Sequence, residues 1–182
     1  MRLPLVRHVD APCEAVSDIS VDVTRTPDGG LTLRYVVLGS VGSILLANPT
    51  DPERSHHLWR HSCFEVFVKV PGDVGYQEYN FAPSSHWAAY GFASRRAGIH
   101  NLDVIAAPLI DSLRNENEFR LTASLAKIGL PDCKPWQLGL SVIIEENSGA
   151  LSFWALAHPL GVADFHHDDC FAITLPAPEH LK

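Results

Sequence analysis

The sequence predicts an all-β fold, an antiparallel, jelly-roll-like sandwich of two sheets with few or no helices. Three observations support this prediction. Apolar residues recur with a period of two in many short segments, which is typical of half-buried strands. Gly, Pro, Asn and Asp separate these segments at short intervals, and strands joined by tight turns pair antiparallel. No window shows the 3.6-residue period of a long amphipathic helix.

The first two predicted strands form a hairpin. Residues Thr26–Gly30 make a turn, because proline presets φ and the glycines accept positive φ. This turn separates Ile19–Thr24 from Leu31–Leu38. One face of the second arm carries Leu31, Leu33, Tyr35 and Val37.

Three more strands are predicted in the middle of the chain, at Cys63–Val70, Tyr76–Phe81 and His86–Phe92. The turns Pro71–Asp73 and Pro83–Ser85 separate them. Strict alternation assigns faces to the polar residues. One face of the first strand carries Cys63, Glu65, Phe67 and Lys69, and one face of the second carries Tyr76, Glu78 and Asn80.

The second half repeats this pattern. Strands are predicted at Glu118–Lys127, Trp136–Glu146, Leu151–His158 and Cys170–Leu175. Ile128–Leu130 is the best place for a short helical turn. Many short strands at near-regular spacing indicate a sandwich or a barrel.

Length and composition favour one domain that covers residues 1–182. The 182 residues are 46% hydrophobic and 19% charged, which is enough apolar material for a core. A net charge of -7 without any basic run argues against a nucleic-acid partner. Neither Met1–Pro12 nor any later window has the apolar length of a signal peptide or membrane span. We therefore expect a cytoplasmic protein without a membrane partner, and the oligomeric state stays open.

Several classes of catalytic and redox site have no signature here. No G-x-S-x-G, H-E-x-x-H, phosphate-binding loop or dinucleotide fingerprint occurs, so the sequence favours a binding protein over an enzyme. Glu65 and Glu78 on adjacent strands leave a carboxylate-pair hydrolase as an alternative. The four cysteines are widely spaced without a C-x-x-C pair, and we expect free thiols.

A histidine-rich segment near the C-terminus raises the question of a metal site. Imidazole and carboxylate groups are metal ligands, so His158, His166, His167 and Asp168 are weak candidates. Adjacent residues of an extended chain point apart, and the set does not close into a ligand sphere. No cofactor is therefore predicted, and a haem or divalent metal remains an alternative.

Aromatic and polar residues suggest a site for a sugar or another small molecule. Trp59 and Trp87 lie in or beside turns, where a sandwich presents its binding loops. Indole faces with a few placed polar groups hold sugars, and the polar candidates are Glu65, Glu78, Asn80 and Arg95. Trp136 and Trp154 lie inside apolar strands and are expected in the core.

Five segments of the chain carry distinctive strings of residues: Leu58–Val68 (LWRHSCFEVFV), Tyr76–Ser84 (YQEYNFAPS), Trp87–Tyr90, Ser152–Pro159 and Asp164–Ala172. With these strings, the chain from about residue 31 to 175 resembles bacterial DOMON-like domains. This superfamily includes family-nine carbohydrate-binding modules and haem-binding cytochrome domains. The resemblance implies a β-sandwich with a sugar or haem ligand at one sheet or its end. It implies the sugar-site candidates Trp59, Glu65, Glu78, Asn80 and Trp87.

The chain resembles the haem-binding cytochrome domains less at the positions of the iron ligands. Those domains often hold iron with Met and His, and the one methionine here is Met1. Ligation of the haem iron by two histidines, for example with His61 or His158, remains as an alternative. The sequence thus predicts a domain that binds a carbohydrate or a similar polyhydroxylated small molecule. The alternatives are a haem or metal protein and an accessory domain without a small ligand.

Overall fold

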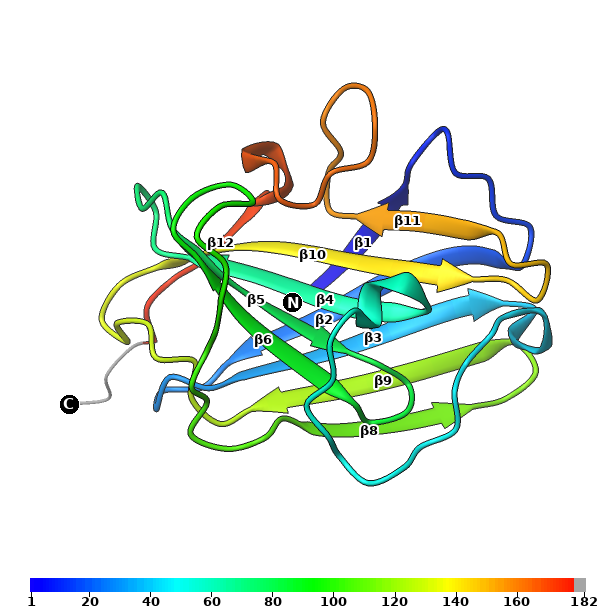
Figure 1. Cartoon of the computed structure of the whole chain (residues 1–182), viewed down its shortest axis with the longest axis horizontal. Helices are drawn as coiled ribbons and strands as arrows, with labels where there is room; N and C mark the ends of the chain where they lie inside the picture. The colour runs from blue at the N-terminus through cyan, green and yellow to red at the C-terminus, as the bar shows by residue number, and fades with distance from the viewer. Residues whose placement is uncertain (179–182) are drawn as a thin grey trace.

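The hairpin at the turn Thr26–Gly30 is present in the computed structural model, which describes residues 1–178 (Figure 1). Strand β2 (Val16–Arg25) pairs antiparallel with β3 (Leu31–Gly39). The Thr26 backbone N–H donates to the Gly30 carbonyl at 3.0 Å, and Gly29 has a φ of +83°. A residue without a Cβ is favoured at that angle, so the glycine allows the tight connection.

The other strands that the sequence predicted are present with small shifts in their bounds, and three further strands, at Arg2–Arg7, His100–Asn101 and Leu109–Arg114, were not predicted. In chain order they are β1 (Arg2–Arg7), β4 (Cys63–Lys69), β5 (Tyr76–Phe81), β6 (Trp87–Phe92), β7 (His100–Asn101), β8 (Leu109–Arg114), β9 (Glu118–Leu125), β10 (Trp136–Glu145), β11 (Leu151–Ala155) and β12 (Ile173–Leu175). The predicted all-β sandwich is therefore confirmed.

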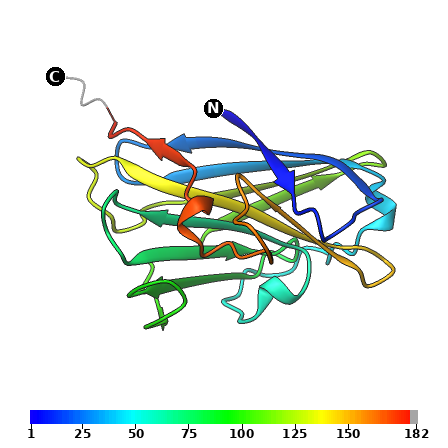
Figure 2. The ribbon, with the colours of Figure 1, turned by 90° about the horizontal axis from the view of Figure 1, so that it is seen from above.

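The strands form one hydrogen-bonded path that curls into two layers. The order is β7-β6-β5-β4-β10-β11-β1-β2-β3-β9-β8, and β12 pairs with β10. We call β4–β7 with β10–β12 the front layer and β2, β3, β8 and β9 the back layer, as seen in Figure 1. Figure 2 shows the two layers from above.

Strand β1 joins the layers at one edge. Its residues Arg2–Leu5 pair with β2 in the back layer, whereas Val6 and Arg7 pair with β11 in the front layer. The sheet therefore passes from one layer to the other within a single strand.

The main core lies between the layers and takes one face of each long strand. The predicted face of β3 is fully buried, and Tyr35 on it donates a hydrogen bond to the Glu65 carbonyl at 2.8 Å across the core. Burial of each large aliphatic or aromatic side chain contributes about 1.5–3 kcal/mol. Among the largest side chains with less than 2% of their surface exposed are Tyr35, Phe64, Phe81, Leu121, Trp136 and Leu140.

The short helices differ from the prediction. Ile128–Leu130 is not helical, because Gly129 has a left-handed φ of +75° and the Ile128 N–H donates to Gly29 instead. Single 3-10 turns occur at η1 (Val41–Ser43), η2 (Leu58–Arg60) and η3 (Asp168–Cys170). The last turn shortens the predicted strand Cys170–Leu175 to Ile173–Leu175. Among residues 1–178, no helix has the length and apolarity that a bilayer crossing requires.

Candidate functional site

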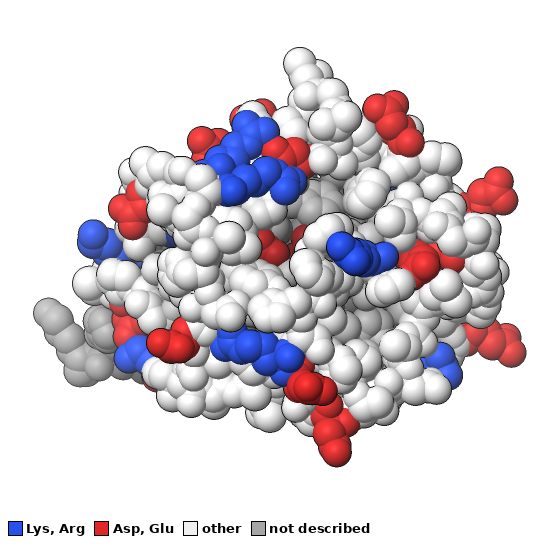
Figure 3. All heavy atoms as spheres, in the orientation of Figure 1, with Lys and Arg blue, Asp and Glu red and all other residues white. Residues whose placement is uncertain are grey.

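The outer face of the front layer carries a row of polar and small side chains. Register places Ser141 of β10 opposite Glu65 of β4, and Glu65 opposite Asn80 of β5. Ala155 and Ala88 end the row on either side. Paired residues share a face of the sheet, and the two alanines leave space beside the polar groups. Figure 3 shows this face hollowed near its centre, with acidic atoms at the bottom of the hollow.

A second row adds aromatic walls to this hollow. Glu78 of β5 lies between Phe67 of β4 and Tyr90 of β6. Gly139 ends the row on β10, where an added Cβ would lie 3.0 Å from the Cys170 carbonyl. The segment that contains η3 therefore covers this end of the outer face. A second apolar cluster packs here, which includes Phe67, Tyr76, Tyr90, Phe92, Phe165 and Phe171.

Hydrogen bonds within the floor leave one buried acceptor free. The Ser141 hydroxyl donates to Glu65 Oε2 at 2.8 Å, and the Asn80 amide donates to Glu78 Oε1 at 2.7 Å. Asn80 is fully buried, and its Oδ1 has no partner among the described residues. A buried amide oxygen without a donor is costly, and in functional sites such an atom often receives a ligand group.

The two buried carboxyl groups have raised pKa values. Glu65 is 3% exposed and Glu78 is 5% exposed. Burial is the main reason why the pKa of Glu65 rises, and the nearby Glu78 raises it further. Burial also raises the pKa of Glu78, although the Asn80 hydrogen bond and the charge of Arg96 act in the other direction. The site therefore holds two carboxyl groups that bind protons more tightly than free glutamates do.

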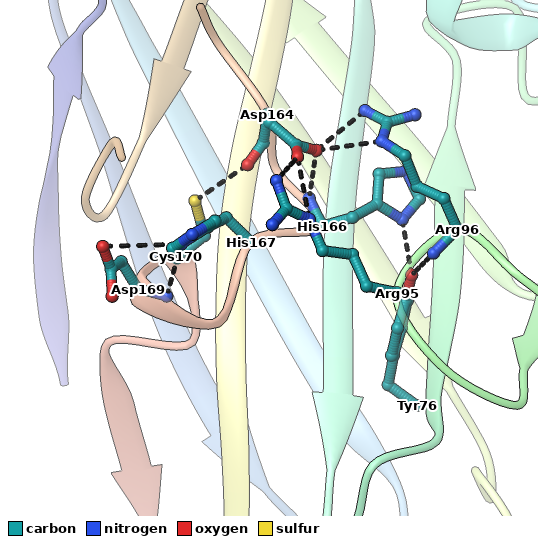
Figure 4. Close-up of polar contacts among 8 residues, drawn as sticks. All are labelled: Tyr76, Arg95, Arg96, Asp164, His166, His167, Asp169 and Cys170. Carbon is teal, nitrogen blue, oxygen red and sulfur yellow. Dashed lines mark hydrogen bonds and ion pairs between the residues drawn. The ribbon is translucent and has the colours of Figure 1, made fainter. Parts of the chain in front are cut away.

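Asp164 joins two loops at one side of the hollow (Figure 4). Its carboxylate accepts hydrogen bonds from both Arg95 and Arg96, and Arg96 Nη2 lies 2.8 Å from Oδ1. It also accepts the His166 backbone N–H at 3.1 Å. Burial alone would raise the pKa of Asp164, but the two arginines outweigh it and lower the pKa to about 2. The segment after β6 is thus fastened to the segment before η3.

Tyr76 extends this network towards the floor. Its hydroxyl is 2.7 Å from His166 Nδ1 and accepts the Arg96 backbone N–H at 3.1 Å. The other imidazole nitrogen of His166 lies 3.8 Å from Glu78 Oε2. Burial, followed by the charge of Arg96, lowers the pKa of His166 to about 4, so this ring is neutral near pH 7.

The segment around η2 covers the outer face from another side. Leu58 packs against the aromatic cluster, and His56 Nδ1 is 2.8 Å from the Tyr90 hydroxyl. Trp59 is 46% exposed, with the Arg60 guanidinium 5.5 Å from its ring. His61 pairs with Glu145 at 2.7 Å.

The structure brings together most of the ligand-site residues that the sequence suggests. Glu65, Glu78 and Asn80 share the floor, Trp59 stands on the exposed η2 turn, and Arg95 is bound to Asp164 at the side. Trp87 is on the opposite face of the sheet. It pairs with Phe81, belongs to the core between the layers and has the Arg54 guanidinium 4.4 Å from its ring.

Other residues of the site were missed by the sequence reasoning. Alternation along β6 already places Tyr90 on the face opposite Trp87, so this residue was open to prediction. Arg96, Asp164 and Ser141 come from separate loops and strands, and no local pattern relates them. Their common position is a result of the tertiary fold.

The four metal candidates are engaged elsewhere. His158 Nε2 is 2.8 Å from the Val6 carbonyl, and His166 contacts Tyr76. His167 Nδ1 accepts the Asp169 N–H at 3.2 Å, and Asp168 pairs with Lys69 at 2.7 Å. Within residues 1–178, no three His, Cys, Asp or Glu side chains gather as a metal site would require. All four cysteines are free, and Cys63 and Cys170 are buried.

A second depression, at one end of the sandwich, lacks comparable chemistry. It has a volume of about 700 Å³ and lies between residues 40–43 and 114–117. None of the charged residues that line it is buried. The hollow on the front layer, with its buried carboxyl groups, is therefore the stronger candidate site.

No family model matches the sequence, and no curated protein matches it. Solved structures do match its fold. A candidate carbohydrate-binding protein from Bacteroides uniformis aligns with a TM-score of 0.70 and 17% identity, over 93% of this chain and 83% of that one. A family 9 carbohydrate-binding module from Caldicellulosiruptor kristjanssonii with cellotriose aligns with a TM-score of 0.52 and 10% identity, over 84% and 75% of the two chains. A family 9 module from the same organism with glucose gives 0.52 and 10%, over 86% and 76%.

Proposed function

We propose that this chain binds a carbohydrate, or a similar polyhydroxylated small molecule, in the hollow on the front layer. The observation that carries the proposal is the buried polar floor of Glu65, Asn80 and Glu78, with Asn80 Oδ1 unpaired among the described residues. Such a floor on an outer sheet face has no role in the main core. The fold is shared with two modules that were solved with cellotriose and with glucose, which supports the same ligand class.

The residues around the hollow match the chemistry of a sugar. Hydroxyl groups of the ligand donate to the carboxyl and amide oxygens of the floor, and Tyr90 offers an aromatic ring at its wall. Trp59 on the η2 turn is exposed, and we infer that it covers the ligand from the solvent side. The resemblance of these strands to DOMON-like domains agrees with a binding role.

Thermal unfolding with a panel of mono- and disaccharides tests the proposal. A sugar at a hundred times its Kd adds about 2.7 kcal/mol of stability, which is a rise of roughly 5–10 °C for a chain of this length. Calorimetric titration then gives the affinity of each sugar that produces a shift.

Two variants locate the site. Asn80→Ala removes the free acceptor, and we expect it to weaken binding of the responding sugar at least about tenfold, since a buried polar contact is lost. Glu118→Gln alters a carboxylate of the back layer and should leave affinity unchanged. If both variants bind as the unaltered protein does, the hollow is not the site. If no sugar shifts the unfolding temperature, the proposed function is wrong.

A further inference from the structure

The floor of the hollow offers acceptors far more than donors. The Ser141 hydroxyl already donates its hydrogen bond to Glu65, and the Asn80 amide donates to Glu78. The acceptors that remain in this floor are carboxyl oxygens and the unpaired Asn80 Oδ1. A ligand that complements this floor must therefore bring hydrogen-bond donors.

The positive side chains near the floor are engaged with other acids. Arg95 and Arg96 both bind Asp164, and Lys69 binds Asp168 at 2.7 Å. Among the described residues, the only basic group within 4 Å of either floor glutamate is His166, 3.8 Å from Glu78, and its ring is neutral near pH 7. Arg96 acts on both glutamates from further away. The two glutamates thus lack a cation in direct contact.

A buried carboxyl group avoids the cost of an unpaired charge in one of two ways: it keeps its proton, or it pairs with a cation. We propose that the missing partner is supplied by the ligand, which carries a protonated primary amine that sits against Glu65, Glu78 and Asn80 Oδ1. This inference rests on the proposed function, and together they specify an amino sugar as the ligand class. The three N–H donors of an ammonium group match the three acceptor groups of the floor.

The aromatic walls of the hollow also favour a bound cation. Tyr90 and Phe67 flank Glu78 in the same row, and Tyr76 is close by in the same aromatic cluster. Aromatic rings attract a cation that has left water. An opposing charge is present, because Arg96 is close enough to influence both glutamates, but Asp164 neutralises it in part.

An ammonium ligand would change the protonation of the floor. Without the ligand, burial raises the pKa of both glutamates, so the pair holds protons near neutral pH. A bound cation favours the charged carboxylates, and binding near pH 7 should release protons to the buffer. The other charged or titratable groups around the pair are Cys63, His56, Lys69, Tyr76, Tyr90, Arg95, Arg96, Asp164 and His166.

Calorimetric titration at pH 7 with D-glucosamine, D-glucose and N-acetyl-D-glucosamine tests the inference. These probes differ at one position, where they carry an ammonium, a hydroxyl or a neutral amide. We expect D-glucosamine to bind at least about tenfold more tightly than either neutral sugar, since one charge-assisted contact gives that ratio. Two buffers of different ionisation enthalpy should reveal proton release, and the preference should shrink at pH 5 as the glutamates keep their protons.

The variant Glu78→Gln separates the charge from the shape of the site. It should weaken D-glucosamine binding by a clearly larger factor than D-glucose binding, so that the preference for the amine falls, whereas Glu118→Gln should change neither affinity. If D-glucosamine binds as tightly as D-glucose or more weakly, the inference of an ammonium group on the ligand is wrong, but the carbohydrate proposal still stands. If none of the three binds, the inference of an ammonium group is wrong. The wider sugar panel then tests the proposed function independently.

Discussion

Two tryptophans illustrate how a single position decides the role of a residue. Both Trp59 and Trp87 lie at turns in the sequence, and both qualify there as ligand contacts. Trp87 is the first residue of β6 and points into the core, while Trp59 lies on a 3-10 turn and is 46% exposed. The position of each side chain in the fold, and not the residue type, separates the roles of the two tryptophans.

Removal of Trp59 should therefore affect the ligand and not the fold. In Trp59→Ala we expect about a tenfold loss of affinity for the responding sugar, because an aromatic face is worth about 1 kcal/mol or more in contact with a ligand. The unfolding temperature should stay within about 2 °C, because an exposed side chain contributes little. Calorimetric titration and thermal unfolding measure the two effects.

Trp87→Phe is the control for that variant. This substitution leaves a cavity in the core and should cost about 1–3 kcal/mol of unfolding free energy without loss of affinity. An affinity loss in Trp87→Phe larger than in Trp59→Ala would contradict the assignment of the two roles.

At the scale of elements, Asp164 holds two loops that no strand pairing connects. Its carboxylate is shared between Arg95 and Arg96, both on the segment that follows β6. Because Arg96 also donates its backbone N–H to Tyr76, this one acid positions the wall of the hollow.

Asp164→Asn should loosen that wall. We expect a loss of about 1–2 kcal/mol of stability at pH 7, since charge-assisted hydrogen bonds are replaced while the arginines remain half-exposed. Faster amide hydrogen exchange at residues 93–98 and 164–167 would show the loosening, with no change in β2 and β3. Exchange that rises uniformly over the chain would indicate a different role.

Strand β1 is the element that closes the sandwich at one edge. Leu5 lies where the strand leaves the back layer, and it is buried in the main core, whereas Val6 beside it is 57% exposed. The seam between the layers therefore depends on an apolar contact at one position of β1.

Leu5→Ala should destabilise the whole domain by about 2–4 kcal/mol, the usual cost of a truncated buried leucine. Val6→Ala, one residue further, should cost less than about 0.5 kcal/mol because the side chain faces solvent. Denaturant unfolding of the two variants measures this contrast, and equal losses would mean that Leu5 is not part of the closing core.

At the scale of the whole molecule, the buried glutamates couple stability to pH. A carboxyl group whose pKa is raised by folding stabilises the protein below its ordinary value of 4.5, and this contribution is lost as the pH rises through the folded pKa. His166 works the other way, since its lowered pKa favours the folded state as the pH rises towards neutral. The pH profile of the unaltered protein thus mixes opposite effects.

Comparison of Glu78→Gln with the unaltered protein isolates one of these effects. The free energy of unfolding of the variant relative to the unaltered protein should rise by about 2 kcal/mol between pH 5 and pH 8, because the charged form of Glu78 no longer has to be buried. Urea unfolding at both pH values measures it. A relative stability that stays flat or falls with pH would show that Glu78 is not held in a desolvated site.

The sequence by itself was sufficient for the fold class and for most of the strands. The period of two along β3, β4 and β5 predicted both the strands and their faces, because a pleated strand alternates its side chains whatever surrounds it. The same rule placed Glu65 on one face of β4 and Glu78 and Asn80 on one face of β5. Local backbone geometry therefore determined three residues of the candidate site in advance.

Only the tertiary structure decided which of those faces is the floor of a site and what encloses it. Ser141, Asp164 and Arg96 come from distant parts of the chain, and pairing of β4 with β10 and the path of the η3 segment bring them to Glu65 and Glu78. The position of Trp87 in the core was not decided by its sequence for the same reason, since burial depends on the second layer that packs against its face. Alternation is a property of one strand, whereas burial, charge pairing and the raised pKa values are properties of everything that surrounds it.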